Sequence, residues 1–298
     1  MNSTPVLRGT TRADLIAMPT VLLGFHPSNS CVVMGLSGAT VAFCARLELD
    51  WFVHHFDQVA DQIINASAQV DGCRFVIIGY GEPDLACLAV TELASVVGES
   101  RVLDSLVTDG RSTWMLDHDL EPREIAASSS SIEAQAVYEG IRICADRREA
   151  VAPVERHAPL PPEEVGAAVA LVTSLSPAAG MELLEQLAES SEPLSRTDAC
   201  VLAVLLEDED RMAALLVRLR MATADTVWPH LVAARQAATP ESEDNVVALL
   251  GIASWLSGRG AAQTSCLEQL ARRNPGHEIG RILDTIHRNG IPPRRWDE

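Results

Sequence analysis

An imidazole, a hydroxyl and a thiol occur close together in the sequence at His26, Ser30 and Cys31. A Ser–His or Cys–His pair can transfer an acyl group when the imidazole reaches the nucleophile and a third residue orients it. Asp14 is a candidate for that third group. The alternative is structural: His26 and Ser30 satisfy backbone groups in a turn that enters a buried strand. Because such side chains serve turns more often than chemistry, the sequence favours the structural role.

The loop formed by Gly79, Tyr80 and Gly81 follows the most strand-like run of the chain. In an open α/β sheet ligands bind where strands end, and the N-terminus of the next helix can receive an anion. These three residues are therefore the ligand-binding candidates. Two glycines are only a fragment of a dinucleotide-binding motif, and Pro83 and Asp84 are poor neighbours for a phosphate. A structural turn is favoured over a ligand site.

One acidic loop carries carboxylates and an imidazole that could bind a divalent cation. Its members are Asp109, Asp117, His118, Asp119 and Glu121. Adjacent side chains on one strand point in opposite directions, so a solvated loop is the favoured interpretation. The pair His54 and His55 lacks a third ligand four residues away and is expected at the helix surface. No metal site is predicted.

Two tryptophans, Trp255 and Trp296, are the candidates for anchoring a partner protein. Core packing is expected for Trp255. Trp296 follows two prolines and two arginines near the C-terminus, so we expect it to be exposed or to dock on a neighbouring subunit. The other aromatic residues are too scattered to form a stacking platform for single-stranded nucleic acid.

The elements that position these residues fall into two groups. The first half of the chain, 1–151, predicts an α/β domain, a mixed sheet with packed helices. The expected strands are 30–36, 40–49, 74–79, 102–108 and 112–116, and the expected helices are 12–18, 51–70, 84–97 and 132–144. Thr11 and Asp14 form a capping box, Pro19 is expected to end the first helix, and Asp84 is expected to cap the third.

Residues 152–163 contain four prolines in twelve positions, which predicts a semi-rigid linker. The remainder, 164–298, is helical by pattern and predicts an all-α bundle or a tetratricopeptide-like domain. Eight helices are expected near 162–174, 177–189, 196–206, 209–221, 223–237, 242–257, 260–273 and 276–289. The segment 255–275 is similar to one tetratricopeptide unit, but no second clear copy follows from the sequence.

The charge balance excludes several classes of function. The chain has 298 residues and a net charge of −18, and all 23 basic residues are arginine. Without lysine there is no P-loop lysine, no Schiff base and no pyridoxal attachment. The excess of acidic residues is shared by both halves, so neither presents the positive surface that duplex nucleic acid or an anionic membrane requires.

The cysteines and the apolar runs indicate a cytoplasmic protein. Seven cysteines occur, none in a Cys-x-x-Cys pair, and most lie within apolar runs. Reduced core thiols are therefore expected rather than disulfides or zinc ligands. No secretory leader is expected at the start, and no apolar run approaches the roughly 20 residues of a membrane span.

Four stretches of the chain resemble an uncharacterised actinobacterial family, the domain of unknown function numbered 4192. They are 12–15 with 22–33, 76–81, 146–149, and 254–261 with 290–296. The resemblance spans nearly the whole chain, and the first stretch is its most specific part. Such genes also occur in actinobacterial phages. The resemblance supplies no catalytic residues to carry over.

Taken together, these patterns favour a non-enzymatic protein-interaction or scaffold module that self-associates. No group of residues forms a convincing catalytic set, and the helical half offers extended surface. The alternative is a small-ligand-binding protein or enzyme that uses the loops at His26 and 79–81. An acidic mimic of nucleic acid is disfavoured because the acidic residues are spread evenly. The expected partner is a protein or a second copy of the chain, and no cofactor is expected.

Overall fold

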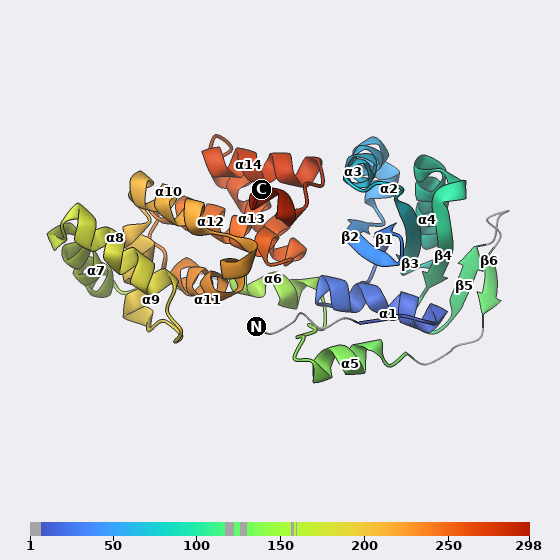
Figure 1. Cartoon of the computed structure of the whole chain (residues 1–298), viewed down its shortest axis with the longest axis horizontal. Helices are drawn as coiled ribbons and strands as arrows, with labels where there is room; N and C mark the ends of the chain where they lie inside the picture. The colour runs from blue at the N-terminus through green and yellow to red at the C-terminus, as the bar shows by residue number, and fades with distance from the viewer. Residues whose placement is uncertain (1–6, 117–121, 126–129, 156–157, 159) are drawn as a thin grey trace. The chain divides into compact units, whose positions relative to one another are not determined.

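The computed structural model describes residues 7–116, 122–125, 130–155, 158 and 160–298. The chain divides into two compact units (Figure 1). Unit 1 contains residues 1–150 and 288–292, and unit 2 contains residues 151–287 and 293–298. The α/β half followed by a helical half confirms the fold class expected from the sequence. The division into 1–151, 152–163 and 164–298 stays a prediction.

Unit 1 is built on a mixed six-stranded sheet with the order β2-β1-β3-β4-β5-β6. The strands are β1 (Ser30–Ser37), β2 (Thr40–Glu48), β3 (Arg74–Tyr80), β4 (Val102–Thr108), β5 (Thr113–Leu116) and β6 (Pro122–Ile125). β3 and β4 are parallel, whereas the other neighbouring pairs are antiparallel. The two predicted hairpins, β1–β2 and β4–β5, are confirmed.

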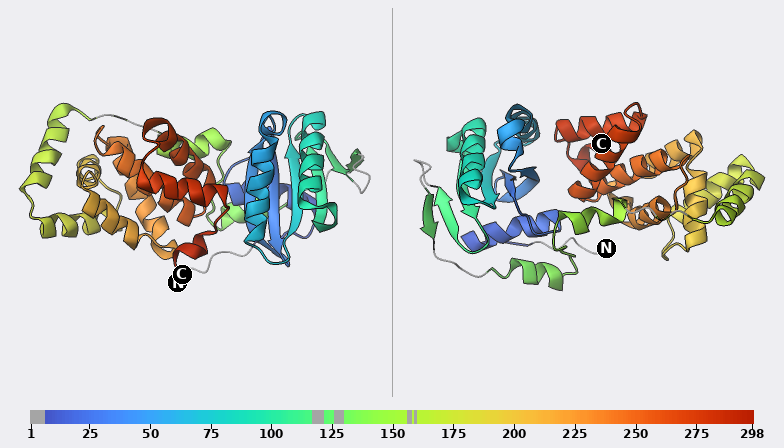
Figure 2. Two further views of the ribbon diagram at one scale, coloured as in Figure 1. Left: turned by 90° about the horizontal axis from the view of Figure 1, so that it is seen from above. Right: turned by 180° about the vertical axis from the view of Figure 1, so that it is seen from behind.

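Helices cover both faces of this sheet (Figures 1 and 2). The helical elements are α1 (Arg12–Leu23), α2 (Trp51–His54), α3 (Phe56–Ala68), α4 (Pro83–Val97), η1 (Glu99–Arg101) and α5 (Ile132–Tyr138). The buried cluster on the α3–α4 face includes Val33, Phe75 and Ile77, and that on the α1 face includes Val32, Val76 and Ile78. Burial on both faces explains why β1 and β3 are continuous apolar runs without polar alternation.

The first helix begins as predicted but continues past the predicted end. Thr11 Oγ1 accepts the Asp14 N–H at 3.2 Å and Asp14 Oδ2 accepts the Thr11 N–H at 3.1 Å, which confirms the capping box. The prediction that Pro19 ends the helix is wrong. α1 includes Pro19 and continues to Leu23, and the next residue, Gly24, closes the helix with a left-handed φ of 77°.

The proline is accommodated because the helix lies against the sheet. Pro19 has no N–H to donate to the Leu15 carbonyl, the acceptor one turn earlier. The Tyr80 hydroxyl of β3 donates to the neighbouring Ile16 carbonyl at 2.7 Å. Leu15 and Ile16 also pack on the apolar cluster of the α1 face. These contacts with the sheet oppose the helix-breaking effect of the proline.

Two other expected helices are shorter than predicted. The segment 51–70 forms two helices that meet at His55, whose φ of −139° departs from helical geometry. The segment 132–144 is helical only to Tyr138, because Gly140 has a φ of 83° and breaks the regular pattern. In both cases the predicted helix extends past the residue at which the backbone leaves helical geometry.

Unit 2 is a run of helices, the first of which begins four residues before the unit boundary at residue 151. They are α6 (Arg147–Glu155), α7 (Pro162–Ser174), α8 (Pro177–Ala188), α9 (Arg196–Leu205), α10 (Glu209–Arg218), α11 (Met221–Ala237), α12 (Glu243–Leu256), α13 (Gly260–Arg273) and α14 (Glu278–Arg288), followed by η2 (Pro293–Trp296). α12 is buried at every residue except Asp244 and Asn245, which are half-buried, and it packs against α11 and α13. Among the helices of the described residues, none combines the length and apolar character needed to cross a bilayer.

The proline-rich segment differs from the expected linker at its start. α6 continues to Glu155, so residues 152–155 are helical despite Pro153. Val151 and Val154 are buried on one side of this helix, and Gln269 Nε2 donates to the Val154 carbonyl at 3.4 Å. Tertiary burial therefore stabilises a helix where proline content indicated an extended chain.

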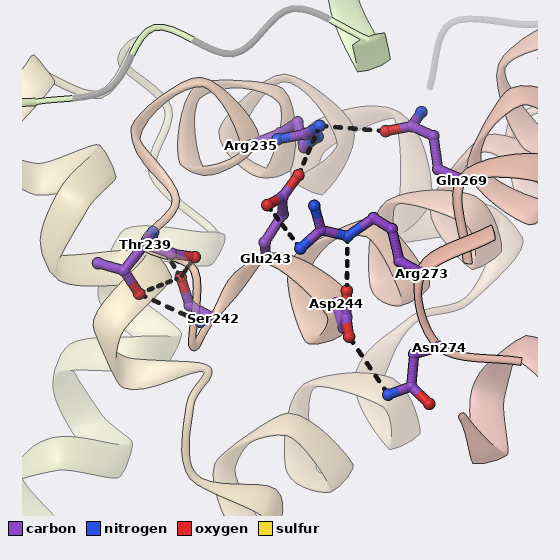
Figure 3. A network of polar contacts seen from close by, with 8 residues as sticks. All are labelled: Arg235, Thr239, Ser242, Glu243, Asp244, Gln269, Arg273 and Asn274. Carbon is purple, nitrogen blue, oxygen red and sulfur yellow. Dashed lines mark hydrogen bonds and ion pairs between the residues drawn. The ribbon is translucent and has the colours of Figure 1, made fainter. Parts of the chain in front are cut away.

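A buried charge network joins α11, α12 and α13 (Figure 3). Arg235 Nη2 lies 3.0 Å from Glu243 Oε1 and donates to Gln269 Oε1 at 3.1 Å. Glu243 Oε2 also pairs with Arg273 at 2.7 Å. The side chains of Arg235 and Glu243 are only 5% and 10% exposed. Arg235 Nε and Nη1 have no hydrogen-bond partner within the described part of the chain. The arginine therefore depends on a single carboxylate.

His277 is expected to make unit 2 less stable in acid. Nδ1 accepts the Gly280 N–H at 3.4 Å, so Nε2 carries the proton and donates to Asn245 Oδ1 at 3.0 Å. Burial lowers the pKa of His277 below 6.5, while Asp244 and Glu278 oppose this shift. Protonation occupies the Nδ1 lone pair, so the stability present above pH 6.5 is lost as the pH falls through the lowered pKa.

The measurement is the melting temperature of the native chain and of His277→Asn between pH 7.5 and 5. Asparagine keeps a helix-capping side chain but does not titrate. We expect the stability difference between the two proteins to shrink as the pH falls. Parallel pH profiles would show that His277 does not contribute to the acid sensitivity.

A candidate ligand cavity at the strand ends of unit 1

Unit 1 contains a cavity of about 690 Å³ at the end of the sheet where the parallel strands β3 and β4 finish. β1 is antiparallel to β3, so its first residue, Ser30, pairs with Tyr80 at the same end. The lining residues are Arg12, Ala13, Ile16, Ala17, Thr20, His26, Pro27, Ser28, Asn29, Tyr80, Gly81, Thr108, Asp109, Gly110, Arg111, Thr113, Ser130 and Glu133. Five separate segments of the sequence thus form one cavity.

The turn after α1 contributes His26 and Asn29 and is held by β2. Arg46 Nη2 donates to the Ser28 carbonyl at 3.0 Å, and both terminal nitrogens of Arg46 bond the Glu48 carboxylate. The Leu49 N–H donates to the Asn29 carbonyl at 3.1 Å. Asn29 has a φ of 45°, unusual for a residue other than glycine. Such conformations persist where surrounding contacts enforce them, and they concentrate at binding sites.

The loop after β3 contributes Tyr80 and Gly81 to the cavity, whereas Gly79 serves packing. A Cβ on Gly79 would lie 2.9 Å from the Ala86 Cβ and 3.0 Å from the Ala86 carbonyl oxygen, so β3 and α4 approach too closely for a side chain. Gly81 has a φ of 139°, and a Cβ added to it would lie 3.1 Å from Asn29 Oδ1, so these two lining residues are neighbours. The three predicted ligand-binding residues therefore have two different roles, and binding by Tyr80 and Gly81 stays a prediction.

The β4–β5 turn contributes Asp109 and Arg111. Asp109 Oδ1 accepts the Arg111 N–H at 2.8 Å and the Ser112 N–H at 2.7 Å, an arrangement typical of tight turns. These two backbone donors lower the pKa of Asp109. The Asp109 carboxylate is therefore engaged by the turn, whereas Arg111 is an exposed residue that lines the cavity.

The opposite wall is formed by α1 and the start of α5. Asp14 Oδ1 accepts the Ser130 hydroxyl at 2.8 Å, which ties the segment before α5 to the cap of α1. Hydrogen bonds, first from the Thr10 N–H and then from the hydroxyls of Ser130 and Thr11, lower the pKa of Asp14 to about 2. Asp14 is therefore occupied in structure and does not orient His26, contrary to the role considered from the sequence.

The predicted catalytic residues occupy different environments. His26 is exposed and lines the cavity. Ser30 is fully buried, and its hydroxyl has no hydrogen-bond partner in the described chain. Cys31 belongs to the apolar cluster on the opposite, α3–α4 face, where burial raises the pKa of its thiol. Successive side chains of a strand point to opposite faces of the sheet, so Ser30 and Cys31 are directed apart. His26, Ser30 and Cys31 therefore cannot share one site.

The N-terminus of α4 is already occupied by a carboxylate from its own chain. Glu82, rather than the expected Asp84, is the capping residue, and its oxygens accept the N–H groups of Asp84 and Leu85 at 3.2 and 2.9 Å. An external phosphate at this position would meet the Glu82 charge. The structure therefore opposes the anion site that this helix start suggested.

The remaining candidates lie elsewhere or outside the described residues. Residues 117–121 of the acidic loop are outside the described part. Elsewhere in the described chain no group of three or more His, Cys, Asp or Glu is placed to hold a metal ion. Trp255 is buried, and Trp296 packs edge-to-face on it at 5.7 Å while donating to the Leu219 carbonyl. Trp296 is half-buried by these contacts within unit 2 rather than fully exposed, and partner binding by Trp255 and Trp296 stays a prediction.

The sequence did not single out Arg12, Arg111, Ser130 and Glu133 as site residues. No pattern that indicates chemistry marks any of these four residues, and the fold brings them to one cavity. The one available signal was the Asp-Gly turn before Arg111, because a hairpin turn that follows a parallel strand lies at the ligand-binding end of the sheet.

These features can be compared with known proteins. The model of the family described as Domain of unknown function (DUF4192) matches residues 13–294. The chain belongs to this family, as the resemblance of its sequence indicated. No curated protein and no solved structure shows significant similarity to it. The family description names no activity, so a function is inferred from the cavity.

Proposed function

We propose that unit 1 binds a small polar ligand in the cavity at the ends of β3 and β4. The observation that carries this proposal is the convergence of His26, Gly81 and Asp109 from three distant segments on one cavity of about 690 Å³. This volume lies within the range typical of ligand sites, and the position follows the rule for open α/β sheets. Hydroxyl, amide, imidazole and guanidinium groups line its wall, as expected for recognition of a polar molecule.

Binding is favoured over catalysis by the same geometry. The candidate nucleophile Ser30 is fully buried and Cys31 lies on the other face of the sheet. His26 therefore lacks a nucleophile from the predicted set within the cavity.

The test is a thermal-shift screen of the full chain against a library of charged and neutral metabolites. Ser28→Trp places an indole at the exposed turn lining the cavity, and Ala39→Trp places one in the exposed β1–β2 turn at the other end of the strand. We expect a ligand that raises the melting temperature of the native chain and of Ala39→Trp. Its effect should be abolished in Ser28→Trp.

Two outcomes would contradict this function. One is that no compound raises the melting temperature of the native chain. The other is that the ligand-induced increase is the same in Ser28→Trp as in the native chain, which would place the site outside the cavity.

We also propose that the chain self-associates through the exposed end of α5. Val137 and Tyr138 are 60% and 88% exposed at consecutive positions. Aromatic side chains of this kind are enriched in protein interfaces. We expect light scattering to give a mass above 32.1 kDa that decreases on dilution. Tyr138→Ser should shift this equilibrium toward the monomer, and a monomeric mass for the native chain at the highest concentration would refute self-association.

A further inference from the structure

We propose that the ligand of this cavity carries an anionic group, phosphate or carboxylate, that binds Arg111 and His26, and an amino group that binds Glu133. This inference rests on the proposed binding function and assigns the chemistry of the ligand. It follows from which charged groups around the cavity are already engaged within the protein and which are open to a ligand.

Arg111 is the cation available to an anionic group. Three other arginines of unit 1, Arg12, Arg46 and Arg142, form ion pairs with Asp104, Glu48 and Glu149. The Arg111 guanidinium has no ion-pair partner among the described residues, although the chain carries a net charge of −18. The neighbouring Asp109 carboxylate is held by backbone N–H groups of the turn. A planar guanidinium with free donors matches a carboxylate or phosphate in two parallel hydrogen bonds.

His26 adds a second polar group from a different wall of the cavity. Its backbone is fixed because its N–H donates to the Cys144 carbonyl at 3.3 Å. The exposed imidazole makes no hydrogen bond within the described residues. A neutral or protonated imidazole can donate to an anionic oxygen. Arg111 and His26 thus both bring hydrogen-bond donors to the same cavity.

Glu133 requires a hydrogen-bond donor, rather than an acceptor, from the ligand. It lies in the first turn of α5, is half-buried, and has no ion-pair partner among the described residues. It lines the cavity together with the buried Tyr80. A carboxylate accepts hydrogen bonds only, so a ligand group here must donate N–H or O–H bonds. An amino group also compensates the charge better than a hydroxyl does.

The anionic group is bound by side chains and not by a helix N-terminus. Glu82 already satisfies the first N–H groups of α4, the position that a dinucleotide phosphate takes in other α/β folds. A single anionic group near Arg111 therefore fits better than a pyrophosphate. A nucleoside monophosphate with an exocyclic amine and a dipeptide both meet these requirements.

The test uses isothermal titration calorimetry of the full chain with two series of probes. The first consists of cytidine monophosphate, uridine monophosphate without the amine, and cytidine without the anion. The second consists of alanylalanine, its N-acetyl derivative and its C-terminal amide. In one of the two series we expect the complete probe to bind. Each truncated probe of that series should bind with an affinity at least roughly ten-fold lower, because each loses a hydrogen bond to a charged group.

The variants assign each contact. Arg111→Gln is expected to weaken the complete probe about ten-fold or more and to leave the probe without the anion unchanged. Glu133→Gln should weaken the complete probe similarly and leave the probe without the amine unchanged. Arg148→Gln and Glu139→Gln remove the same charges from exposed positions that do not line the cavity and should have no effect.

The outcomes also separate this inference from the proposed function. If neither complete probe binds, or if truncated probes bind equally well, the inference is overturned. Trehalose serves as a neutral probe: if it or another neutral compound binds and Ser28→Trp abolishes that binding, the cavity remains a ligand site with different chemistry. If no compound binds, charged or neutral, both this inference and the proposed binding function are contradicted.

Discussion

Glu243→Leu is expected to lower the free energy of unfolding of unit 2 by about 3–5 kcal/mol, because it leaves a buried guanidinium without its carboxylate. Arg235 is 5% exposed and pairs with Glu243 at 3.0 Å. Its remaining hydrogen bond to a side chain goes to the neutral Gln269, and two of its nitrogens have no partner in the described chain. Water cannot readily replace the lost charge at this depth. Chemical denaturation measures the loss, and hydrogen exchange of α11 to α13 peptides localises it.

The matched control removes both members of the pair. Arg235→Met together with Glu243→Leu replaces the charges by apolar side chains of similar size, a change that is often neutral or stabilising in proteins. We expect the double variant to recover most of the stability lost by Glu243→Leu. An exposed pair provides the comparison: Glu185→Leu, which loses a contact to Arg218, should cost about 1 kcal/mol or less. If Glu243→Leu costs no more than this, Arg235 does not depend on the buried carboxylate.

Gly79→Ala is expected to destabilise unit 1 by about 1–3 kcal/mol, the usual cost of overpacking a core. The added Cβ would lie 2.9 Å from the Ala86 Cβ and 3.0 Å from the backbone oxygen of the same residue. The strand is central and the helix backbone is rigid, so neither moves without disturbing the buried cluster around Ala86 and Val90. The effect is measured as a loss of unfolding free energy, with the affinity for any cavity ligand measured in parallel.

A double-mutant cycle tests the assigned cause. Ala86→Gly removes one of the two close contacts, so Gly79→Ala in that background should cost less than in the native chain. Gly38→Ala is a control at an open turn, where the added Cβ meets no atom within 4 Å and only the φ of 60° opposes it. Additive effects of Gly79→Ala and Ala86→Gly would show that strand–helix contact is not the reason for the glycine.

The accuracy of sequence-based prediction differed between strands and helix ends. The hairpin of β1 and β2 and the turn after β4 followed from short-range signals, such as Asp109-Gly110 between two apolar runs. The capping box at Thr11 is equally local. The end of α1 was mispredicted because Pro19 disfavours a helix, while contacts of Ile16 with the sheet stabilise it. The N-cap of α4 was assigned two residues late because Glu82 and Asp84 both carry carboxylates that can accept the first N–H groups of the helix.

The candidate site was predicted only in part. His26, Tyr80 and Gly81 were selected because they lie next to predicted strand ends, and they line the cavity. Arg111 and Glu133 were not selected, because a single arginine in a turn or a glutamate in a first helical turn has no distinctive sequence pattern. Ser30 and Cys31 were grouped with His26 by sequence distance, although the pleat of β1 directs neighbouring side chains to opposite faces.

The sequence by itself determined the family, the α/β character of the first half, the helical character of the second, and the absence of lysine chemistry. These properties depend on composition, periodicity and local turn signals, which act over a few residues. The tertiary structure alone decided which side chains line the cavity, that Trp296 packs on Trp255, and that Arg235 depends on Glu243. These relations join residues far apart in the chain, so they arise from how β1, β3 and β4 align and how α11, α12 and α13 pack. Local sequence patterns carry no information about those distances.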